Sequence, residues 1–360
     1  MTRVFAVEDT AVELDWPSLR RGEHTVEVGP TTTTVVGDGG PQACWIDGLP
    51  PDTTLDVVVD GRRATTARTM ATPPGRALTR IATVGDLHIG DGWTFGLWPT
   101  VSHAGGVDDP IVVKCTRAAL AEIAAWGADL LIVKGDITHH GRDDEWALAA
   151  QLLAESGTPA IATIGNHDVK HAPVLGHEHL ARVGVELVVD AVATRDLPGV
   201  RVVVADATIP GRHPGTLRHV GASIVEAAGS APGPTLVALH HQIHPLPVIT
   251  HWPPGIVTAP SFLRELGAAN PSTFVTSGHT HRHRARRVGP LLVTEVGSPK
   301  DYPGTWAGYV VHEGGIRQVV RRTADPEVIR WTEATKRALF GAWGRWSPGR
   351  LEDRCVTLLS

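Results

Sequence analysis

The sequence is poor in cysteine and has no long apolar run. Its three cysteines, Cys44, Cys115 and Cys355, lie far apart and form no CxxC pair. This argues against a zinc ribbon or a CxxC redox site and makes a reducing cytoplasm the expected location. The first residues, MTRVFAVEDT, show no apolar segment behind a basic start, and no uncharged apolar stretch is long enough to span a bilayer. We therefore expect no export signal and no membrane span.

An excess of positive charge is also missing. The formal net charge is −5, so no overall positive field exists that would hold nucleic acid or an anionic membrane. Nucleic acid is therefore not the expected partner, and a small anionic substrate would have to be bound by local groups. Nothing in the sequence predicts an oligomeric state.

The length and the early part of the chain predict more than one domain. A chain of 360 residues exceeds the usual size of a single domain. Residues 1–74 contain short alternating segments separated by turn residues, which predicts a small β-sandwich. The segments LDW, GLPPDTTLDVVV and ART make this region resemble a shortened fibronectin type III module. The stretch ATPPGRA then breaks both helix and strand, so a linker is expected near Pro74.

Residues 75–325 predict a layered α/β domain. The apolar runs RIATV, DLLIVK and PAIATI alternate with the helical stretches CTRAALAEIAAW and EWALAAQLLAES. The later runs, from VRVVVAD to RQVVRR, are mostly strands, and we expect them to add a second sheet. Residues 326–360 form a C-terminal extension, in which DPEVIRWTEATKRALFGAWGRW predicts an amphipathic helix packed on the body. Trp331, Trp343 and Trp346 are then packing residues, with membrane docking as the alternative.

Polar side chains follow five of the predicted strands. An Asp-x-His or His-x-His pair in an extended loop can direct two donors to one side. Mixed carboxylate, imidazole and amide ligands suit manganese, iron or zinc better than calcium. A glycine before most of these motifs would allow the backbone to turn sharply after the strand. The motifs are Asp86-Leu87-His88, Asp136 to Gly141, Asn166-His167-Asp168, His240-His241 and His279-Thr280-His281.

In this order the motifs DxH, GDxxxxG, GNHD, a downstream histidine and GHTH resemble the calcineurin-like metallophosphoesterase signature, over about residues 80–283. The resemblance implies a four-layer αββα sandwich and two divalent or trivalent ions of manganese, iron or zinc. It implies a first metal on Asp86, His88, Asp136 and His281, and a second on Asp136, Asn166, His240 and His279, so that Asp136 bridges the two.

The resemblance also implies roles next to the metals. His167 would lie beside the substrate and assist the leaving alkoxide, and Asp168 would hold its ring. The fourth motif departs from the family pattern of a histidine, one residue and a proline, because it reads HHQIHP here. His240, His241 and His244 are therefore all candidates for the second metal, and we favour His240 because it directly follows the apolar strand.

Two branches of the superfamily fit less well. Purple acid phosphatases place a tyrosine three positions after the bridging aspartate, where this chain has His139. Protein serine/threonine phosphatases read GDxVDRG and GNHE, whereas this chain reads GDITHHG and GNHD. The remaining resemblance is to phosphodiesterases, including the class III cyclic-nucleotide enzymes and glycerophosphodiesterases. We expect hydrolysis of a small organic phosphodiester by a hydroxide shared between the metals. The alternatives are a phosphomonoesterase, a nuclease, or a metal-binding scaffold protein without catalysis.

Several further residues carry open interpretations. The insert from Gly92 to Asp109 could line a substrate pocket or could simply cover the first loop. The basic run from Arg282 to Arg287 could steer phosphate or form a solvated strand edge. The candidate substrate-binding residues are Trp93, Trp98, His103 and His241, with Phe95 beside them; His139, His140, His171, His177 and His179 are expected to be solvated loop residues.

Overall fold

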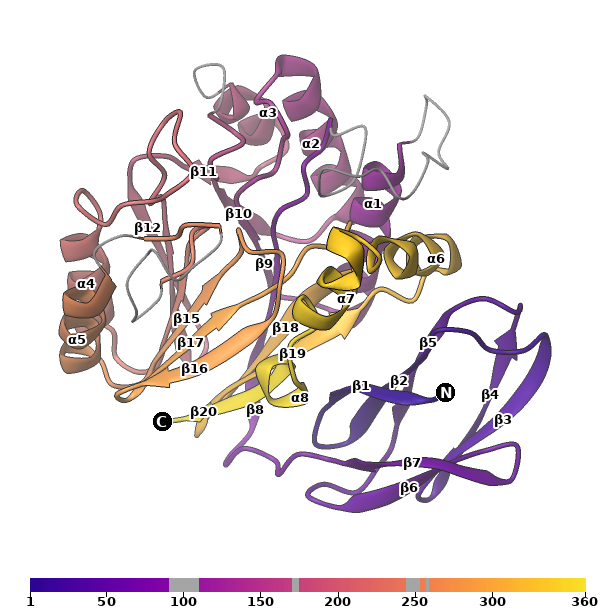
Figure 1. Cartoon of the computed structure of the whole chain (residues 1–360). Coiled ribbons are helices and arrows are strands. Elements are labelled where there is room, and N and C mark those ends of the chain that lie inside the picture. The colour runs from indigo at the N-terminus through magenta and orange to yellow at the C-terminus, as the bar shows by residue number, and fades with distance from the viewer. Residues whose placement is uncertain (91–109, 170–174, 244–252, 257–258) are drawn as a thin grey trace.

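The computed structural model describes residues 1–90, 110–169, 175–243, 253–256 and 259–360. The first seven strands form a separate β region (Figure 1), in which two antiparallel sheets enclose the buried side chains of Trp16, Val26 and Ile46. The prediction of a small N-terminal β-sandwich is confirmed. One sheet contains β1 (Arg3–Val7), β2 (Ala11–Trp16) and β5 (Gln42–Asp47), and the other contains β4 (Thr31–Gly37), β3 (Gly22–Val28), β6 (Thr54–Val59) and β7 (Arg62–Arg68).

The main body contains two larger sheets. The seven-stranded sheet has the order β11 (Glu186–Val188), β10 (Ala160–Thr163), β9 (Leu130–Lys134), β8 (Ala77–Val84), β18 (Thr305–His312), β19 (Gly315–Arg322) and β20 (Cys355–Leu359). The six-stranded sheet has the order β12 (Val192–Leu197), β13 (Val200–Ala205), β14 (Thr235–Ala238), β15 (Thr273–Ser277), β17 (Leu291–Glu295) and β16 (Arg284–Val288). Strands β8 to β11 are parallel to one another, as are β13, β14, β15 and β17.

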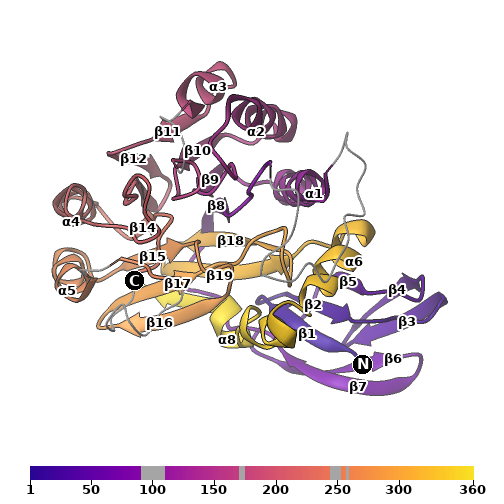
Figure 2. The ribbon, with the colours of Figure 1, turned by 45° about the horizontal axis from the view of Figure 1, so that its top comes forward.

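Helices cover the outer face of each sheet (Figure 2). Helices α1 (Ile111–Trp126), α2 (Asp143–Ser156) and α3 (Gly176–Arg182) pack on the seven-stranded sheet, and α4 (Gly221–Gly229) and α5 (Ala259–Ala269) pack on the other. Helix α2 has three acidic residues in its first turn and ends at Gly157 with a left-handed φ of 63°, both of which favour these boundaries. The predicted four-layer αββα sandwich is confirmed.

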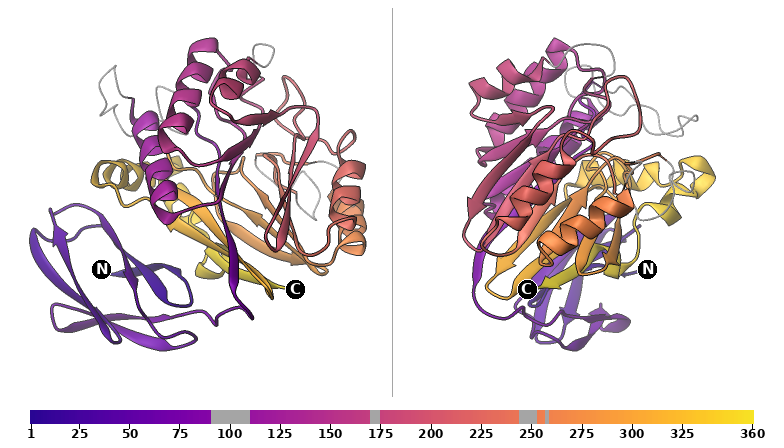
Figure 3. Two further views of the ribbon diagram at one scale, coloured as in Figure 1. Left: turned by 180° about the vertical axis from the view of Figure 1, so that it is seen from behind. Right: turned by 90° about the vertical axis from the view of Figure 1, so that its left-hand side faces the viewer.

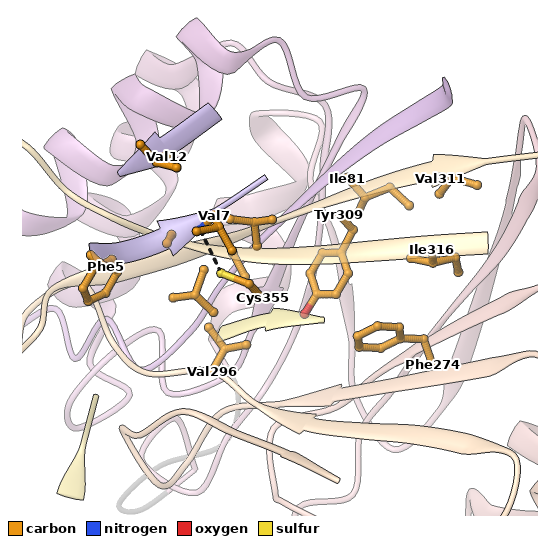
Figure 4. Close-up of a cluster of buried hydrophobic side chains, with 14 of the residues drawn as sticks. Phe5, Val7, Val12, Ile81, Phe274, Val296, Tyr309, Val311, Ile316 and Cys355 are labelled. Atoms are coloured by element: carbon orange, nitrogen blue, oxygen red, sulfur yellow. Dashed lines mark hydrogen bonds between the residues drawn. The ribbon is translucent and has the colours of Figure 1, made fainter. Parts of the chain in front are cut away.

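The two sheets meet in a central core of buried hydrophobic side chains (Figure 4). Ile81, Phe274 and Tyr309 are fully buried there, and the Phe274 and Tyr309 rings meet edge to face with centroids 5.4 Å apart. The same core continues into the sandwich, where the Val7 N–H donates to Cys355 Sγ at 3.2 Å. The sandwich therefore packs against the last strands of the body, on the side away from α4 and α5 (Figure 3).

Two expectations about the C-terminal part are wrong. β18 and β19 join the first sheet and not the second, because β18 pairs antiparallel with β8, and β20, a strand that was not predicted, pairs with β19. The expected single helix is broken into α6 (Pro326–Thr335), a 3-10 turn (Leu339–Gly341) and α7 (Trp343–Trp346), followed by α8 (Leu351–Arg354). Leu339, Phe340 and Gly341 all have positive φ, and successive left-handed residues cannot continue an α-helix. Trp331 and Trp343 are buried, as predicted for packing residues.

A buried ion-pair network joins the sandwich to the body. The Arg322 guanidinium contacts Asp15 of β2 at 2.5 Å and Glu333 of α6 at 3.1 Å. Arg3 contacts the same two carboxylates at 2.6 and 3.0 Å. Burial favours the neutral form of Glu333, but Arg322 and Lys336 outweigh it and lower the pKa of this carboxyl. The network thus holds three distant segments of the chain together.

Arginine and tryptophan side chains add a second link. The Arg321 guanidinium lies 4.1 Å from the Trp45 ring of the sandwich and 5.2 and 5.5 Å from the rings of Trp126 and Trp306 in the body. Such cation–π contacts stabilise partly desolvated arginines.

No helix among the described residues is long and apolar enough to cross a membrane.

Removing the centre of the ion-pair network is expected to destabilise the protein strongly. Arg322→Met should lower the free energy of unfolding by about 3 kcal/mol, because buried Asp15 and Glu333 lose the fully buried one of their two shared arginine partners and keep only the more exposed Arg3. Arg63→Met is the matched control, since its ion pair with Asp56 is exposed, and it should cost less than about 1 kcal/mol. Urea denaturation measures both, and equal costs for the two variants would contradict the role of the network.

Candidate metal centre

The candidate ligands come together where strands of both sheets end. β8, β9 and β10 lead into Asp86, Asp136 and Asn166, while β14 and β15 of the other sheet lead into His240 and the His279–His281 loop. Carboxyl ends of parallel strands share one edge of a sheet, so loops far apart in sequence become neighbours. All seven predicted ligands are at most 7 % exposed: Asp86, His88, Asp136, Asn166, His240, His279 and His281.

One group of donors surrounds the first predicted metal position. His88 Nε2 lies 3.2 Å from His281 Nε2, and His281 Nε2 lies 3.4 Å from Asp86 Oδ1. Asp136 Oδ2 lies 3.7 Å from His88 Nε2. Two imidazoles and two carboxylates therefore direct their donor atoms toward a common point.

A second group lies on the other side of Asp136. His240 Nε2 lies 3.1 Å from His279 Nδ1 and 3.2 Å from Asn166 Oδ1. The Asp136 Oδ2 atom is 3.4 Å from His240 Nε2. The same carboxylate oxygen thus faces both imidazole pairs.

These distances fit cation binding. Two nitrogens bound to one ion at about 2.0–2.1 Å lie roughly 3.0–3.4 Å apart at octahedral or tetrahedral angles. The nitrogen pairs at 3.1 and 3.2 Å match this spacing. The donor set of imidazole, carboxylate and amide oxygen suits manganese, iron or zinc. The residues present therefore fit the metals that the sequence predicts.

Burial favours the neutral form of two of the four ligand imidazoles, and neutral imidazole is the form that binds metals. Desolvation lowers the pKa of His88 and of His279 well below the ordinary value. In the other two, nearby carboxylates outweigh burial: Asp136 raises the pKa of His240 to about 9, and Asp86 and Asp301 raise the pKa of His281. Burial also opposes ionisation of Asp136, but His240 and His167 outweigh it and hold its pKa well below the usual range. Beneath the site, desolvation lowers the pKa of the fully buried Lys134 to about 7, although Asp86 acts in the opposite direction.

Hydrogen bonds between the loops hold the carboxylates in place. The His279 N–H donates to both oxygens of Asp86 at 3.0 and 3.1 Å, and the His167 N–H donates to Asp136 Oδ1 at 2.8 Å. His240 Nδ1 lies 2.9 Å from the Lys134 carbonyl oxygen, so its Nδ1–H is donated there and Nε2 faces the carboxylate. The ligand loops therefore orient one another.

Backbone strain is concentrated in the same loops. Asp86, His88 and Asp136 have φ of 56°, 49° and 47°, and His279 and His281 have φ of 66° and 51°. Non-glycine residues rarely adopt this left-handed region, and they persist there where the surroundings impose it, often at functional sites. The sharp turns after the strands are thus made largely by the ligands themselves.

The glycines of the motifs serve mainly close packing. A Cβ on Gly165 would lie 2.3 Å from Asp136 Oδ1 and 2.8 Å from His240 Nε2. A Cβ on Gly278 would lie 2.5 Å from Asp86 Oδ2. Neither glycine has a positive φ, whereas Gly135 before Asp136 has a φ of 71°, so the conformational freedom expected of these glycines is used at Gly135. A side chain at Gly165 or Gly278 would displace a ligand.

The expected contact between Asp168 and the His167 ring is absent from the described part of the chain. Asp168 accepts hydrogen bonds from the backbone N–H groups of Ile137, Thr138 and Gly165 at 2.8–3.2 Å and from the Thr138 hydroxyl at 2.7 Å. Its two oxygens are occupied in fixing the Asp136 loop to the Gly165 turn. Burial and the nearby Asp136 raise its pKa to about 7. His167 Nδ1 instead lies 3.1 Å from the His139 carbonyl oxygen.

The candidates for substrate contact and for the fourth motif are placed only in part. Trp93, Phe95, Trp98, His103 and His244 lie outside the described residues. His241 is fully buried, with Nε2 3.1 Å from the His213 carbonyl oxygen, and burial next to His240 lowers its pKa to about 3. Of the two described histidines, His240 is the one whose nitrogen faces Asp136 and Asn166.

Three of the neighbouring polar residues, His139, His140 and Arg282, are less solvated than expected. His139 is half-buried, and its Nδ1 lies 3.3 Å from His88 Nδ1; His140 contacts Glu145 at 3.3 Å. His177 is exposed, His179 pairs with Asp143, and His171 lies outside the described residues.

In the basic run, Arg282 is buried, and it and Arg286 both pair with Glu295 at 2.9 and 2.6 Å. These two side chains therefore share one buried carboxylate within the fold.

A cavity of about 760 Å³ lies at the same edge of the sheets. Its wall includes Ile164, two residues before Asn166, and Gly215. A Cβ on Gly215 would lie 2.7 Å from the His241 ring, so this part of the wall packs against the residue that follows the candidate ligand His240. Apolar and polar groups both contribute to the lining, which includes Val169, Val189, Thr208, Ile209, Arg212 and Arg218.

Adding one methyl group at Gly165 is expected to disrupt the centre. Gly165→Ala should weaken manganese binding by about 10–100-fold, because the new Cβ overlaps Asp136 and His240. Gly233→Ala is the matched control, since a Cβ there meets no atom within 4 Å. Metal content after dialysis, measured by mass spectrometry, distinguishes them. Full metal content in Gly165→Ala would contradict the assigned geometry.

Comparison with known proteins finds similar sequences among cyclic nucleotide phosphodiesterases. A cyclic nucleotide phosphodiesterase, named as probable, from Rhodococcus erythropolis is 35% identical over 144 residues, which cover 37% of this chain and 45% of the relative. A 3′,5′-cyclic adenosine monophosphate phosphodiesterase from Pseudomonas aeruginosa is 30% identical over 167 residues, covering 45% and 58%. The chain thus spans about half the length of these two relatives.

A solved structure and a family profile extend the comparison. Purple acid phosphatase from yellow lupin aligns with a TM-score of 0.49 at 12% identity, over 89% of this chain and 71% of that one. The profile of the calcineurin-like phosphoesterase family matches residues 79–283, which are 205 of the 360 residues and include all seven candidate ligands. The chain therefore belongs to the calcineurin-like phosphoesterase family.

Proposed function

We propose that this protein is a two-metal hydrolase that cleaves a small organic phosphodiester. The observation that carries the proposal is the position of Asp136 Oδ2, which lies within 3.4–3.7 Å of an imidazole nitrogen on each side. Asp86, His88 and His281 would hold one ion with Asp136, and Asn166, His240 and His279 would hold the other. Manganese, iron and zinc all suit this donor set.

Bound cations would supply a water of lowered pKa and would neutralise charge on the phosphoryl oxygens. The protein's own contribution is rigid placement. Because the ligands are buried and tied to one another by hydrogen bonds, few groups need to reorganise when charge develops in the transition state. The strained left-handed loops support the same interpretation, since they fix the donors before substrate arrives.

His167 is the proposed proton donor to the leaving alkoxide. Its ring centroid lies 4.5 Å from that of His88, at the edge of the ligand cluster. With Nδ1–H donated to the His139 carbonyl oxygen, the proton that His167 exchanges is carried by Nε2. Asp168 acts indirectly, because it fixes the Asp136 loop and the Gly165 turn that carry the bridging ligand and His167.

The cavity supports a diester as the substrate. A phosphodiester has two organic groups, and the cavity of about 760 Å³, whose wall includes Ile164 and Gly215, offers space for one of them. Its mixed lining suits an organic group with both apolar and hydrogen-bonding parts. The cyclic nucleotide phosphodiesterases among the relatives also favour diesters.

The direct test is hydrolysis of bis-(p-nitrophenyl) phosphate and of p-nitrophenyl phosphate. Metal-stripped protein refilled with manganese should cleave the diester faster than the monoester, and stripped protein should cleave neither. Asp136→Ala should lose metal and activity together, because it removes a ligand from both sites. If two metals bind and neither ester is cleaved, the alternative of a metal-binding scaffold protein is favoured.

His167→Ala in the same assay separates chemistry from metal binding. Turnover should fall by about 10²–10⁴-fold, since a proton donor is lost while the metal ligands remain. The loss should be larger for an alkyl ester than for the p-nitrophenyl ester, because an alkoxide needs protonation more. Unchanged turnover of the alkyl ester, with normal metal content, would refute this role for His167.

A further inference from the structure

Asp301 is a buried carboxylate directed at one of the candidate ligands. It is 1% exposed, and its Oδ2 accepts from His281 Nδ1 at 2.5 Å. The other ring nitrogen of His281, Nε2, faces Asp86 and His88. The imidazole therefore lies between Asp301 on one side and the first metal position on the other.

A carboxylate in this position has two effects on a metal-binding histidine. It keeps the hydrogen on Nδ1, so that the lone pair of Nε2 faces the metal, and it fixes the orientation of the ring. It also makes the imidazole a stronger electron donor. Asp301 Oδ1 has no hydrogen-bond partner among the described residues, so the contact with His281 is the principal bond of this carboxylate.

The segment that carries Asp301 is held by the C-terminal extension. Trp331 Nε1 of α6 donates to the Lys300 carbonyl oxygen at 2.9 Å, and the Tyr302 N–H donates to Thr335 Oγ1 at 2.8 Å. The Tyr302 side chain packs with Ala338 and Trp343 in a separate buried cluster. Both peptide groups that flank Asp301 are therefore fixed by residues 331–343.

The His281 loop has further contacts with the same extension. The His283 N–H donates to the Ser347 carbonyl oxygen at 2.9 Å, and the Arg282 guanidinium lies 4.7 Å from the Trp346 ring. The family profile ends at residue 283. Asp301 and the extension thus lie outside the segment by which the family is identified.

We propose that Asp301 is a positioning residue for His281 and that the C-terminal extension, by holding Asp301, raises the affinity of the first metal position. The proposal rests on the proposed metal centre but not on its catalytic activity. It predicts a selective effect, because the side-chain contact of Asp301 in the described part of the chain is with His281, whereas Asn166, His240 and His279 would hold the second ion.

The test compares manganese affinities by competition with a chromophoric chelator. Asp301→Ala should weaken one of the two manganese-binding steps, the one at the position that contains His281, by about 10–100-fold. The other step should stay within about threefold of its wild-type affinity. Asp301→Asn, which keeps the shape and one acceptor but not the charge, should give a smaller loss. Glu122→Gln is the matched control, since this carboxylate accepts from Trp306 Nε1 and the Ala324 N–H at a distance from the ligands.

A second variant tests the extension itself. Thr335→Val removes the acceptor for the Tyr302 N–H and keeps the side-chain shape, so it should weaken the same step by about threefold to tenfold. The thermal midpoint of the metal-free protein separates lost positioning from lost folding.

Unchanged affinity in both Asp301 variants, or equal weakening of both steps, would overturn the proposal. So would wild-type protein that binds no metal. Wild-type protein that binds metal but cleaves no diester would contradict only the proposed function, since affinity is measured without turnover.

Discussion

The carboxylate of Asp136 is the group on which the rest of the site depends. A single oxygen lies between two imidazole pairs contributed by loops of both sheets. Holding a buried carboxylate there is unfavourable unless positive charge or hydrogen-bond donors compensate for lost hydration. The loops supply one hydrogen-bond donor, the His167 N–H. The arrangement of the ligand atoms suits bound cations as the source of the remaining positive charge. The two-sheet arrangement is needed because neither sheet alone can surround this atom.

The need to hold the Asp136 carboxylate between these ligands explains features that would destabilise the fold elsewhere. Five candidate ligands adopt left-handed backbone conformations, and Gly165 and Gly278 leave no room for a side chain. Lys134 is fully buried below the centre, where its ammonium donates to Thr276 Oγ1 and the Ser277 carbonyl oxygen. Strain and buried charge are tolerated because the surrounding layers are fixed by a large hydrophobic core.

The periphery of the molecule is linked to this centre by continuous contacts. The sandwich is joined to β19 and α6 through Arg322, and α6 holds the segment that carries Asp301. Since Asp301 contacts His281, the N-terminal sandwich is separated from a candidate ligand by a short series of buried polar contacts. A small β-sandwich can thus support a catalytic domain through packing, without contributing to the chemistry.

The sequence was most informative where local pattern determines structure. Glycine and polar residues directly after apolar runs predicted the five ligand loops, since the end of a strand is a local feature. The sheet to which β18 and β19 belong could not be predicted in this way, because pairing with β8 depends on contacts more than 200 residues apart. Asp301 was missed for the same reason, as no motif surrounds it and only the fold brings it to His281. The predicted contact between Asp168 and the His167 ring was also wrong. The backbone N–H groups that donate to this carboxylate belong to two loops that only the fold brings together.

Electron paramagnetic resonance of the manganese-loaded protein tests the central claim most directly. If Asp136 bridges two ions, protein loaded with two equivalents of manganese should give the spectrum of an exchange-coupled pair, and Asp136→Ala should not. Signals of isolated manganese ions at every loading would contradict a shared carboxylate and, with it, the proposed two-metal centre.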